Sequence, residues 1–201
     1  MNKSFNLCVG TIGSGAWLSP DGGESWRRVG RGLWSESRVF GLTLHPIEPR
    51  TVFAGADDGI YRSQDGGQSF ERLSSPMNDT QVWKIAVDPV DPDIIFAGTR
   101  PSALFRSRDG GRSWQQLAVE MAKECPNVRI PRVTALAVDP SDHRIVGWGR
   151  GRRGSAQHGW WRYLADGYQR HQRPRYPRRR SGRERQDEGV NNDAARDLRQ
   201  H

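Results

Sequence analysis

Three short stretches of nearly identical sequence decide the fold of this chain: SPDGGESW at residues 19–26, SQDGGQSF at 63–70 and SRDGGRSW at 107–114. Their first residues are evenly spaced, since 63 − 19 and 107 − 63 both equal 44. In each stretch the aspartate can accept hydrogen bonds from backbone N–H groups, and the glycine pair allows backbone angles that are closed to other residues. The final aromatic residue begins an outgoing strand and can pack over the turn. The pattern predicts a β-hairpin that recurs at a fixed interval.

Further features repeat in phase with these hairpins. GLTLHP (41–46), KIAVDP (84–89) and ALAVDP (135–140) come first, the apolar stretches TVFAG (51–55) and IIFAG (94–98) follow, and GIYRS (59–63) and ALFRS (103–107) run directly into a hairpin. Four short strands in a unit of this length are typical of a β-propeller blade. The sequence therefore predicts an all-β chain. We expect an incomplete β-propeller of about three four-stranded blades over residues 1–146, followed by a disordered, non-globular basic tail over 147–201.

The three hairpins resemble the Asp-box, or BNR, repeat of sialidases, xyloglucan-active glycosidases, sortilin-type receptors and photosystem II assembly factors of the Ycf48 type. The chain is most similar to bacterial BNR-repeat proteins that carry a glycosyl hydrolase label. The resemblance implies a propeller fold, but it does not imply an activity, because in those families the boxes lie on the perimeter, away from the ligand site. The residues to which we assign a structural role in the boxes are Ser19, Asp21, Gly23, Trp26, Ser63, Asp65, Gly67, Phe70, Ser107, Asp109, Gly111 and Trp114.

All of the net charge lies in the tail. The chain has 31 Lys plus Arg and 23 Asp plus Glu, a formal net charge of +8. Residues 147–201 hold 14 Arg, no Lys and 6 Asp plus Glu, which accounts for the whole excess. Apolar residues are scarce there, so this segment cannot bury enough surface to offset its chain entropy.

The loss of the repeat after residue 146 suggests a frameshift. With permitted codons, residues 157–165 read from the second codon base give S-T-D-G-G-D-T-W, a complete Asp box, and residues 149–156 give A-G-V-D-G-V-R-R. The central Gly-Gly follows from Trp160 and Trp161 whatever codons surround them. We hypothesise a frameshift, natural or a sequencing error, between about Val146 and Gly149, which would make the chain a truncated fragment. The coding DNA across codons 140–165 tests this hypothesis.

The remaining composition excludes several classes of protein. The alternative to a frameshift is a genuine basic tail that contacts nucleic acid. Because the shifted frame accounts for the arginine-rich sequence, we expect no nucleic-acid partner. Cys8 and Cys125 are too few for a disulfide framework, and no apolar run suits a signal peptide or a membrane span, so we expect a cytoplasmic protein without a membrane partner. Scattered histidines and the absence of a phosphate-binding loop predict no metal and no cofactor.

A candidate ligand site lies where the inner strands open onto the channel of a propeller. The segments that lead into these strands, 32–42, 76–86 and 125–136, align Arg38, Gln81 and Arg132 just before each strand. Aromatic, arginine and carboxylate side chains there would suit a sugar or an acidic ligand, whereas the alternative is that each arginine only caps a loop or pairs with a neighbouring acid. The candidate rim residues are Trp34, Glu36, Arg38, Asn78, Asp79, Gln81, Trp83, Asn127, Arg129 and Arg132.

Two functions remain open. The first is a non-catalytic interaction or ligand-binding scaffold, whose partner is an unknown protein or carbohydrate. The second is a glycoside hydrolase of the sialidase-like propeller type. A glycosidase of another kind would need two carboxylates about 5 to 10 Å apart, for example Glu36 and Asp79. Sialidase chemistry implies a Tyr and Glu nucleophile pair. Of the four tyrosines only Tyr61 lies in the repeat region, and it directly precedes a box on an outer strand, where no nucleophile is expected. We assign no catalytic residue and expect the scaffold.

Overall fold

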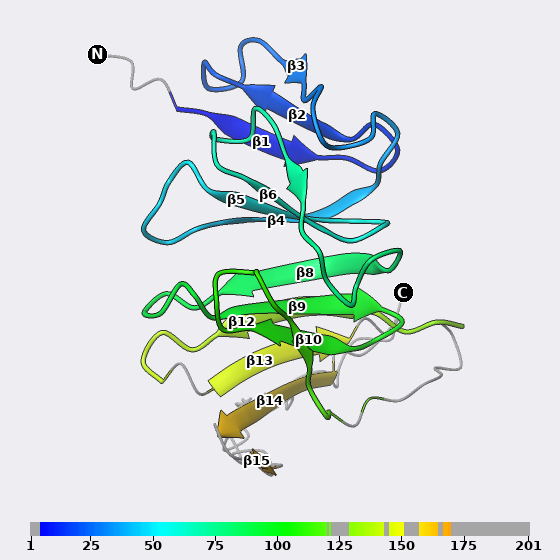
Figure 1. Ribbon diagram of the computed structural model, residues 1–201, viewed down its shortest axis with the longest axis vertical. Coiled ribbons are helices and arrows are strands. Elements are labelled where there is room, and N and C mark those ends of the chain that lie inside the picture. The colour runs from blue at the N-terminus through cyan, green and yellow to red at the C-terminus, as the bar shows by residue number, and fades with distance from the viewer. Residues whose placement is uncertain are drawn as a thin grey trace, which may run out of the picture.

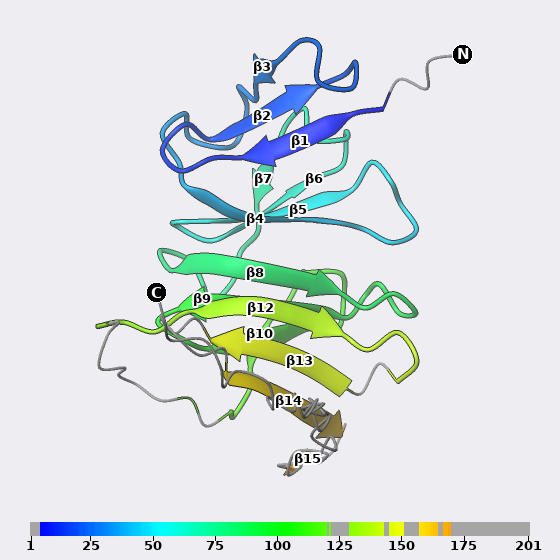
Figure 2. The same ribbon diagram turned by 180° about the vertical axis from the view of Figure 1, so that it is seen from behind.

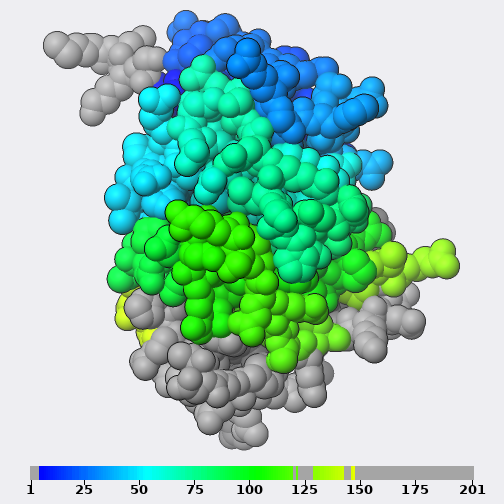
Figure 3. Space-filling model, in the orientation of Figure 1, coloured from blue at the N-terminus to red at the C-terminus, as the bar shows by residue number. Residues whose placement is uncertain are grey.

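A computed structural model describes residues 5–119, 121, 129–142, 145–150, 157–164 and 167–169. These residues form β-strands in four antiparallel sheets, which confirms the all-β propeller architecture. The sheets follow one another along the long axis of the molecule, from the N-terminal sheet at one end to the fourth sheet at the other (Figures 1 and 2). In the space-filling view the first three sheets form adjacent bands in chain order (Figure 3).

Each sheet takes its strands in the order of the sequence. The first contains β1 (Leu7–Gly10), β2 (Ala16–Ser19) and β3 (Arg27–Arg28). The second contains β4 (Val39–Leu44), β5 (Val52–Ala56), β6 (Ile60–Ser63) and β7 (Glu71–Arg72), and the third contains β8 (Gln81–Val87), β9 (Ile95–Arg100), β10 (Leu104–Ser107) and β11 (Gln115–Gln116). The fourth contains β12 (Val133–Val138), β13 (Ile145–Arg150), β14 (Gln157–Leu164) and β15 (Gly167–Gln169).

The first strands of the second, third and fourth sheets are neighbours in space. Strand β8 contacts both β4 and β12 and lies between them in Figure 2. We call β4, β8 and β12 the inner strands. The first sheet has three strands and lacks a counterpart of them among the described residues. Val9 of β1 is accordingly 43% exposed, whereas Ala54 and Ala97, at the equivalent positions of β5 and β9, are fully buried.

The fourth sheet extends beyond the limit that the sequence suggested. We expected the propeller to end at residue 146, but β13 continues to Arg150, and β14 and β15 lie within the segment that we assigned to a non-globular tail. The sequence of β14, QHGWWRYL, is rich in aromatic residues, which favour strands. Residues 170–201, which include the rest of the predicted tail, lie outside the described residues.

The hydrophobic core is divided among the spaces between successive sheets. The strands contain apolar residues either at alternate positions or in continuous runs, and they bury these side chains against the next sheet. The stability of each sheet therefore depends on its neighbours. The cluster at the first interface includes Ala16, Leu18, Val39, Val52 and Phe70; the next includes Phe53, Ile60, Met77, Val82 and Ile95; the last includes Phe96, Leu104, Leu117, Val133 and Val146.

A glycine and a valine make a close contact at each interface. The glycines are Gly10, Gly55 and Gly98, at equivalent positions of β1, β5 and β9, and the valines are Val39, Val82 and Val133 of the inner strands that follow them. A Cβ atom built on these glycines would lie 2.6 Å from Val39 Cγ1, 2.5 Å from the carbonyl oxygen of Val82 and 2.5 Å from Val133 Cγ1. Successive sheets therefore approach as closely as they do because glycine has no side chain.

Each of these valines also precedes a β-bulge. The register between the first and second strands shifts between Val39 and Gly41, between Val82 and Lys84, and between Val133 and Ala135. The residue in the bulge is Phe40, Trp83 or Thr134 in the three sheets. Because a bulge redirects the extra side chain, the sequence repeat places one such side chain at the start of every inner strand.

The predicted Asp boxes form hydrogen-bonded hairpin turns. Ser63 Oγ donates to Asp65 Oδ1 (2.8 Å) and accepts from the backbone N–H of Gly67 (2.8 Å). Asp65 Oδ1 also accepts from the backbone N–H groups of Gln68 and Ser69, both at 2.9 Å. The first and third boxes repeat this arrangement at Asp21 and Asp109. Their tryptophan indoles, Trp26 and Trp114, donate to the carbonyls of Gly23 and Gly111.

The three boxes predict a loss of stability in acid. Hydroxyl and backbone donors, led by Ser25 and Ser113, lower the pKa of Asp21 and Asp109 to about 2. At Asp65 desolvation raises the pKa, but donors from Ser69, Ser63 and Gln68 outweigh it and bring the pKa to about 2. Because these folded-state pKa values lie below the unfolded value of about 3.9, their stabilisation is complete above pH 4 and disappears as the pH falls toward 2.

Thermal unfolding followed by circular dichroism from pH 7 to pH 2 checks this prediction. We expect the melting temperature to fall steeply between pH 4 and pH 2, and the fall to be shallower in an Asp65→Asn variant. A melting temperature that does not change over that interval would contradict it.

Candidate functional site

The candidate site lies at the end of the molecule where the inner strands begin. Arg38 directly precedes β4, Gln81 is the first residue of β8, and Arg132 directly precedes β12, as the sequence predicted. The turns that join the second and third strands of each sheet reach the same end, because neighbouring strands are antiparallel. Gln81, for example, pairs with Arg100 at the end of β9.

An aromatic and arginine stack connects three consecutive sheets at this end. The rings of Phe40 and Trp83 are stacked, with centroids 4.2 Å apart and an interplanar angle of 13°. The guanidinium of Arg132 lies over the Trp83 ring, with Cζ 4.2 Å from the ring centroid. Because β8 lies between β4 and β12, the indole has the phenyl ring on one face and the guanidinium on the other. A cation–π contact of this kind is worth about 1 kcal/mol and orients the arginine.

The stack is bordered by buried hydrogen-bond donors that have no partner among the described residues. Trp83 Nε1 is satisfied, because it donates to Gln81 Oε1 (3.2 Å). In contrast, Arg132 Nε, Arg100 Nε and Ser102 Oγ are buried and make no hydrogen bond with the part of the chain that the structure describes. Buried donors in folded proteins almost always have a partner, so these three atoms are exceptions among the described residues.

The structure brings only some of the predicted rim residues together. Gln81, Trp83 and Arg132 share the contacts described above, whereas Trp34 is 72% exposed and Glu36 is exposed, with no side-chain hydrogen bond or ion pair to a described residue. Arg129 is exposed, and Asn127 lies outside the described residues. The alternative in which each arginine pairs with a neighbouring acid does not hold for Arg132, which stacks on an indole instead.

Asp79 and Asn78 belong to a separate cluster in the loop between β7 and β8. Asp79 Oδ1 accepts from Arg72 Nη2 (3.0 Å), and the side-chain oxygen of Asn78 accepts from Ser75 Oγ (3.5 Å). Asp79 has a positive φ of 65°, a conformation that the short carboxylate side chain tolerates. These two residues therefore stabilise their own loop.

Tyr61 lies in the same region of the second sheet, on β6. Its hydroxyl donates to Asp58 Oδ2 (2.7 Å). Burial, together with this hydrogen bond and the charge of Asp58, raises the pKa of Tyr61, so the phenol stays protonated at neutral pH. A protonated phenol on an outer strand is a poor nucleophile, in agreement with the interpretation of the sequence.

Sequence analysis missed three residues of the site. Phe40 follows Val39 as Trp83 follows Val82, so an alignment of the inner strands would have identified it. Arg100 ends β9 and Ser102 lies in the turn that follows, whose counterpart in the second sheet is the acidic turn at residues 57–59. No repeat pattern predicted them, because the two turns differ in sequence.

Comparison with known proteins places the chain in a family. The family model described as sortilin, neurotensin receptor 3 (Sortilin-Vps10) matches residues 14–126 and 58–161, which together span most of the chain. The chain belongs to this family. Its Asp boxes are thus the repeated hairpins of a sortilin-Vps10 propeller.

Two kinds of relative stand out for this sortilin-Vps10 chain. A xyloglucanase from Hypocrea jecorina (strain QM6a) is 32% identical over 101 residues, which make up 50% of this chain and 12% of the xyloglucanase. The structure of an ancestral GH74 enzyme aligns with a TM-score of 0.63 at 22% identity over 80% of this chain and 21% of the enzyme. The structure of YCF48 bound to D1 peptide aligns with a TM-score of 0.52 at 18% identity, over 79% of this chain and 51% of that one. At these identities, the structural matches establish the fold alone.

Other kinds of site are not found among the described residues of this family member. No group of three or more His, Cys, Asp or Glu side chains in them could hold a metal ion. None of the described segments forms a helix of the length and apolarity that would cross a membrane.

Proposed function

We propose that this propeller is a non-catalytic scaffold that binds a ligand rich in acceptor oxygens, either a carbohydrate or an acidic protein segment, at the start of its inner strands. The supporting observation is the stack of Phe40, Trp83 and Arg132 beside buried donors without partners. Since both faces of the indole are occupied, the tryptophan serves as a support that holds the guanidinium flat. A guanidinium fixed in this way donates in set directions and loses little freedom when a ligand binds.

The relatives are consistent with both ligand classes. YCF48 was solved with a peptide, and the Hypocrea jecorina relative is a xyloglucanase. Because the chain spans 12% of that xyloglucanase and 21% of the ancestral GH74 enzyme, the ligand of the whole protein is part of this proposal.

A glycoside hydrolase is the alternative, favoured by the 32% identity to the xyloglucanase. Hydrolysis of a glycosidic bond needs an acid and a second carboxylate across the scissile bond. Of the two candidates, Asp79 is paired with Arg72, and Glu36 is exposed and has no contact with a described residue that would orient it. The described residues thus provide a better binding surface than a catalytic pair. A nucleic-acid contact through the basic tail, residues 147–201, is a second alternative, and most of that segment lies outside the described residues.

An Arg132→Ala variant tests the binding role. We expect a xyloglucan oligosaccharide or a short acidic peptide to bind the wild-type protein in isothermal titration calorimetry, and the variant to bind at least about tenfold more weakly, since a charge-assisted hydrogen bond is lost. An Arg50→Ala variant is the matched control, because it removes the same charge at the opposite end of the second sheet.

The outcomes separate the two functions. Binding without release of reducing sugar supports the scaffold. Release of reducing sugar that stops in a Glu36→Gln variant supports the hydrolase. If the folded wild-type protein binds neither probe, or if Arg132→Ala binds as tightly as the wild type, the proposed rim is wrong.

A further inference from the structure

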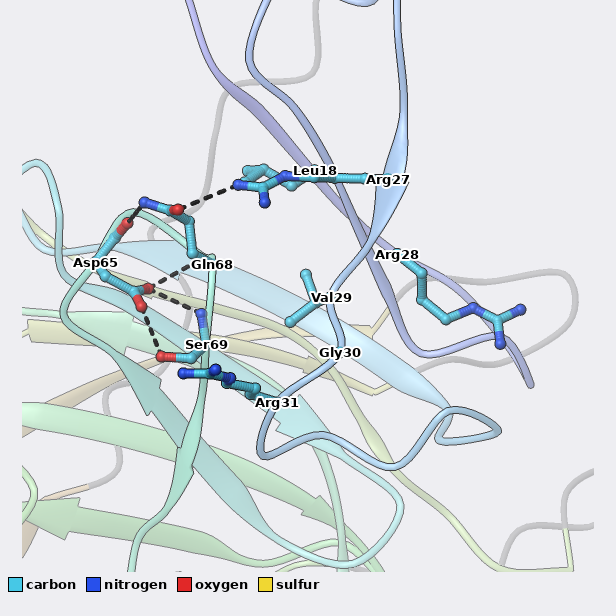
Figure 4. A pocket seen from close by; sticks show the side chains of 9 residues that line it. All are labelled: Leu18, Arg27, Arg28, Val29, Gly30, Arg31, Asp65, Gln68 and Ser69. Carbon is cyan, nitrogen blue, oxygen red and sulfur yellow. Dashed lines mark hydrogen bonds between the residues drawn. The ribbon is translucent and has the colours of Figure 1, made fainter.

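A second site lies on the perimeter, away from the inner strands. A groove of ≈ 460 Å³ opens between the first and second sheets (Figure 4). One wall is formed by β3 and the loop after it, residues 27–31, and the other by the second Asp-box turn with Asp65, Gln68 and Ser69. Three arginines, Arg27, Arg28 and Arg31, lie in the first wall.

Two of these arginines have guanidinium N–H donors that are not used within the described residues. Arg27 donates through Nη2 to the neutral Gln68 Oε1 (3.1 Å), and the side chain of Arg31 makes no hydrogen bond or ion pair with any described residue. Neither forms a salt bridge with a described carboxylate. Arg28 differs, because its guanidinium lies 5.3 Å from the Trp17 ring centroid and is directed away from the Asp-box turn in Figure 4.

The acid in the groove does not neutralise them. Asp65 accepts hydrogen bonds from Ser63 Oγ, from the backbone N–H groups of Gln68 and Ser69, and from Ser69 Oγ (2.6 Å). These donors belong to its own turn and hold both carboxylate oxygens there. The groove therefore keeps a positive surplus that faces solvent.

The other sheets provide an internal comparison. In phase with the repeat, Arg27, Arg28 and Arg31 correspond to Glu71, Arg72 and Ser75 in the second sheet and to Gln115, Gln116 and Val119 in the third. Glu71 is bonded to Arg62 at 2.6 Å, and Arg72 to Asp79 at 3.0 Å. The third sheet has no charge at these positions. Among the described repeats, the first alone places unpaired guanidiniums beside the following Asp box.

We propose that this groove binds a tetrahedral oxyanion, a phosphate or sulfate ester carried by a ligand, between Arg27 and Arg31. The guanidinium fork matches phosphate and sulfate oxygens two at a time. Two forks that approach from different parts of one wall are matched more fully by a tetrahedral anion, whose three or more oxygens point in different directions, than by the two coplanar oxygens of a single carboxylate. The site is separate from the rim of the inner strands and would give the scaffold a second point of attachment.

Small oxyanions test the proposal directly. Phenyl phosphate, phenyl sulfate and benzoate are titrated into the full chain at constant ionic strength, and binding is followed by the chemical shifts of the arginine Nε–Hε groups. We expect the phosphate ester to bind more tightly than the sulfate ester, because it carries a second negative charge, and benzoate to bind at least tenfold more weakly than either. Tighter binding of the sulfate ester would identify sulfate esters as the ligand class and would still support an oxyanion site in this groove.

Substitutions then assign the site to its residues. We expect the Arg27→Gln/Arg31→Gln variant to lose at least tenfold in phosphate affinity and Arg28→Gln, the matched control, to lose less than twofold. Arg31→Lys should fall between them if the fork matters as well as the charge. All of these side chains are exposed, so the fold should be retained, and circular dichroism confirms this.

Three results would overturn the proposal. These are an unchanged affinity in the double variant, an equal loss in Arg28→Gln, which would indicate general electrostatic attraction, and equal affinities for benzoate and the phosphate ester.

Discussion

A Gly55→Ala variant is expected to lose about 3 kcal/mol of its free energy of unfolding. The new Cβ would lie 2.5 Å from the carbonyl oxygen of Val82, a backbone atom of the next inner strand. A backbone atom cannot rotate away as a side chain can, so the second and third sheets would have to separate, and overpacking of this kind costs about 1–3 kcal/mol or more. Chemical denaturation followed by tryptophan fluorescence measures the change.

The control for this experiment is Gly30→Ala. A Cβ on Gly30 has no atom within 4 Å, and the position needs no unusual backbone angle. We expect this variant to be as stable as the wild type or slightly more stable, because alanine restricts the unfolded chain. If Gly55→Ala and Gly30→Ala prove equally stable, the sheets do not pack as described.

The equivalent contact at the next interface allows a rescue. At Gly98 the clash of a new Cβ would be with the Val133 side chain, at 2.5 Å from Cγ1. Gly98→Ala should therefore destabilise. Because Val133 Cβ also lies 2.6 Å from the new atom, only Val133→Gly removes the clash, and the Gly98→Ala/Val133→Gly double variant should lose less than the sum of the two single variants. Additive losses in the double variant would mean that the two residues do not compete for one space.

The second large effect is expected at the central Asp box. Asp65→Ala removes an acceptor for Ser63, Gln68 and Ser69 and leaves their donors to water, and we expect a loss of about 2 kcal/mol in the free energy of unfolding. The loss should be present in full at pH 7 and be much smaller near pH 2, where the wild-type carboxylate, with a pKa of about 2, is itself largely protonated in the unfolded chain and about half protonated in the folded one. Urea denaturation at the two pH values measures it.

Glu24→Ala is the matched control for the box. Glu24 lies in the first box at the position that Gln68 occupies in the second, and it makes no side-chain contact with a described residue. We expect its stability to be within about 0.5 kcal/mol of the wild type. A loss as large as that of Asp65→Ala would show that charge, and not the turn geometry, is responsible.

The repeat predicted the fold because each hairpin is specified by a short stretch of local sequence. The spacing of the boxes and the alternation of apolar strands identified the hairpins, and Trp83 and Arg132 were found as the residues that flank an inner strand. The stack of Phe40, Trp83 and Arg132 could not be predicted, because it depends on the bulges after Val39 and Val82. These bulges shift the strand register but do not change the pattern of apolar residues in the sequence. Asp79 was misplaced for another reason: Arg72, seven residues away, pairs with it inside one loop.

The spacing between sheets, set by a missing side chain at each interface, also shapes how the molecule comes apart. Among the described strands, each sheet makes its main contacts with the sheets before and after it, so its stability is approximately a sum of terms between nearest neighbours. The third sheet has a described partner on both sides, whereas β1–β3 and the fourth sheet have one each, so separating the third sheet breaks two interfaces and separating either of the others breaks one. In this respect the described sheets behave as a linear stack, in which the stability of each layer depends on the layers that it contacts.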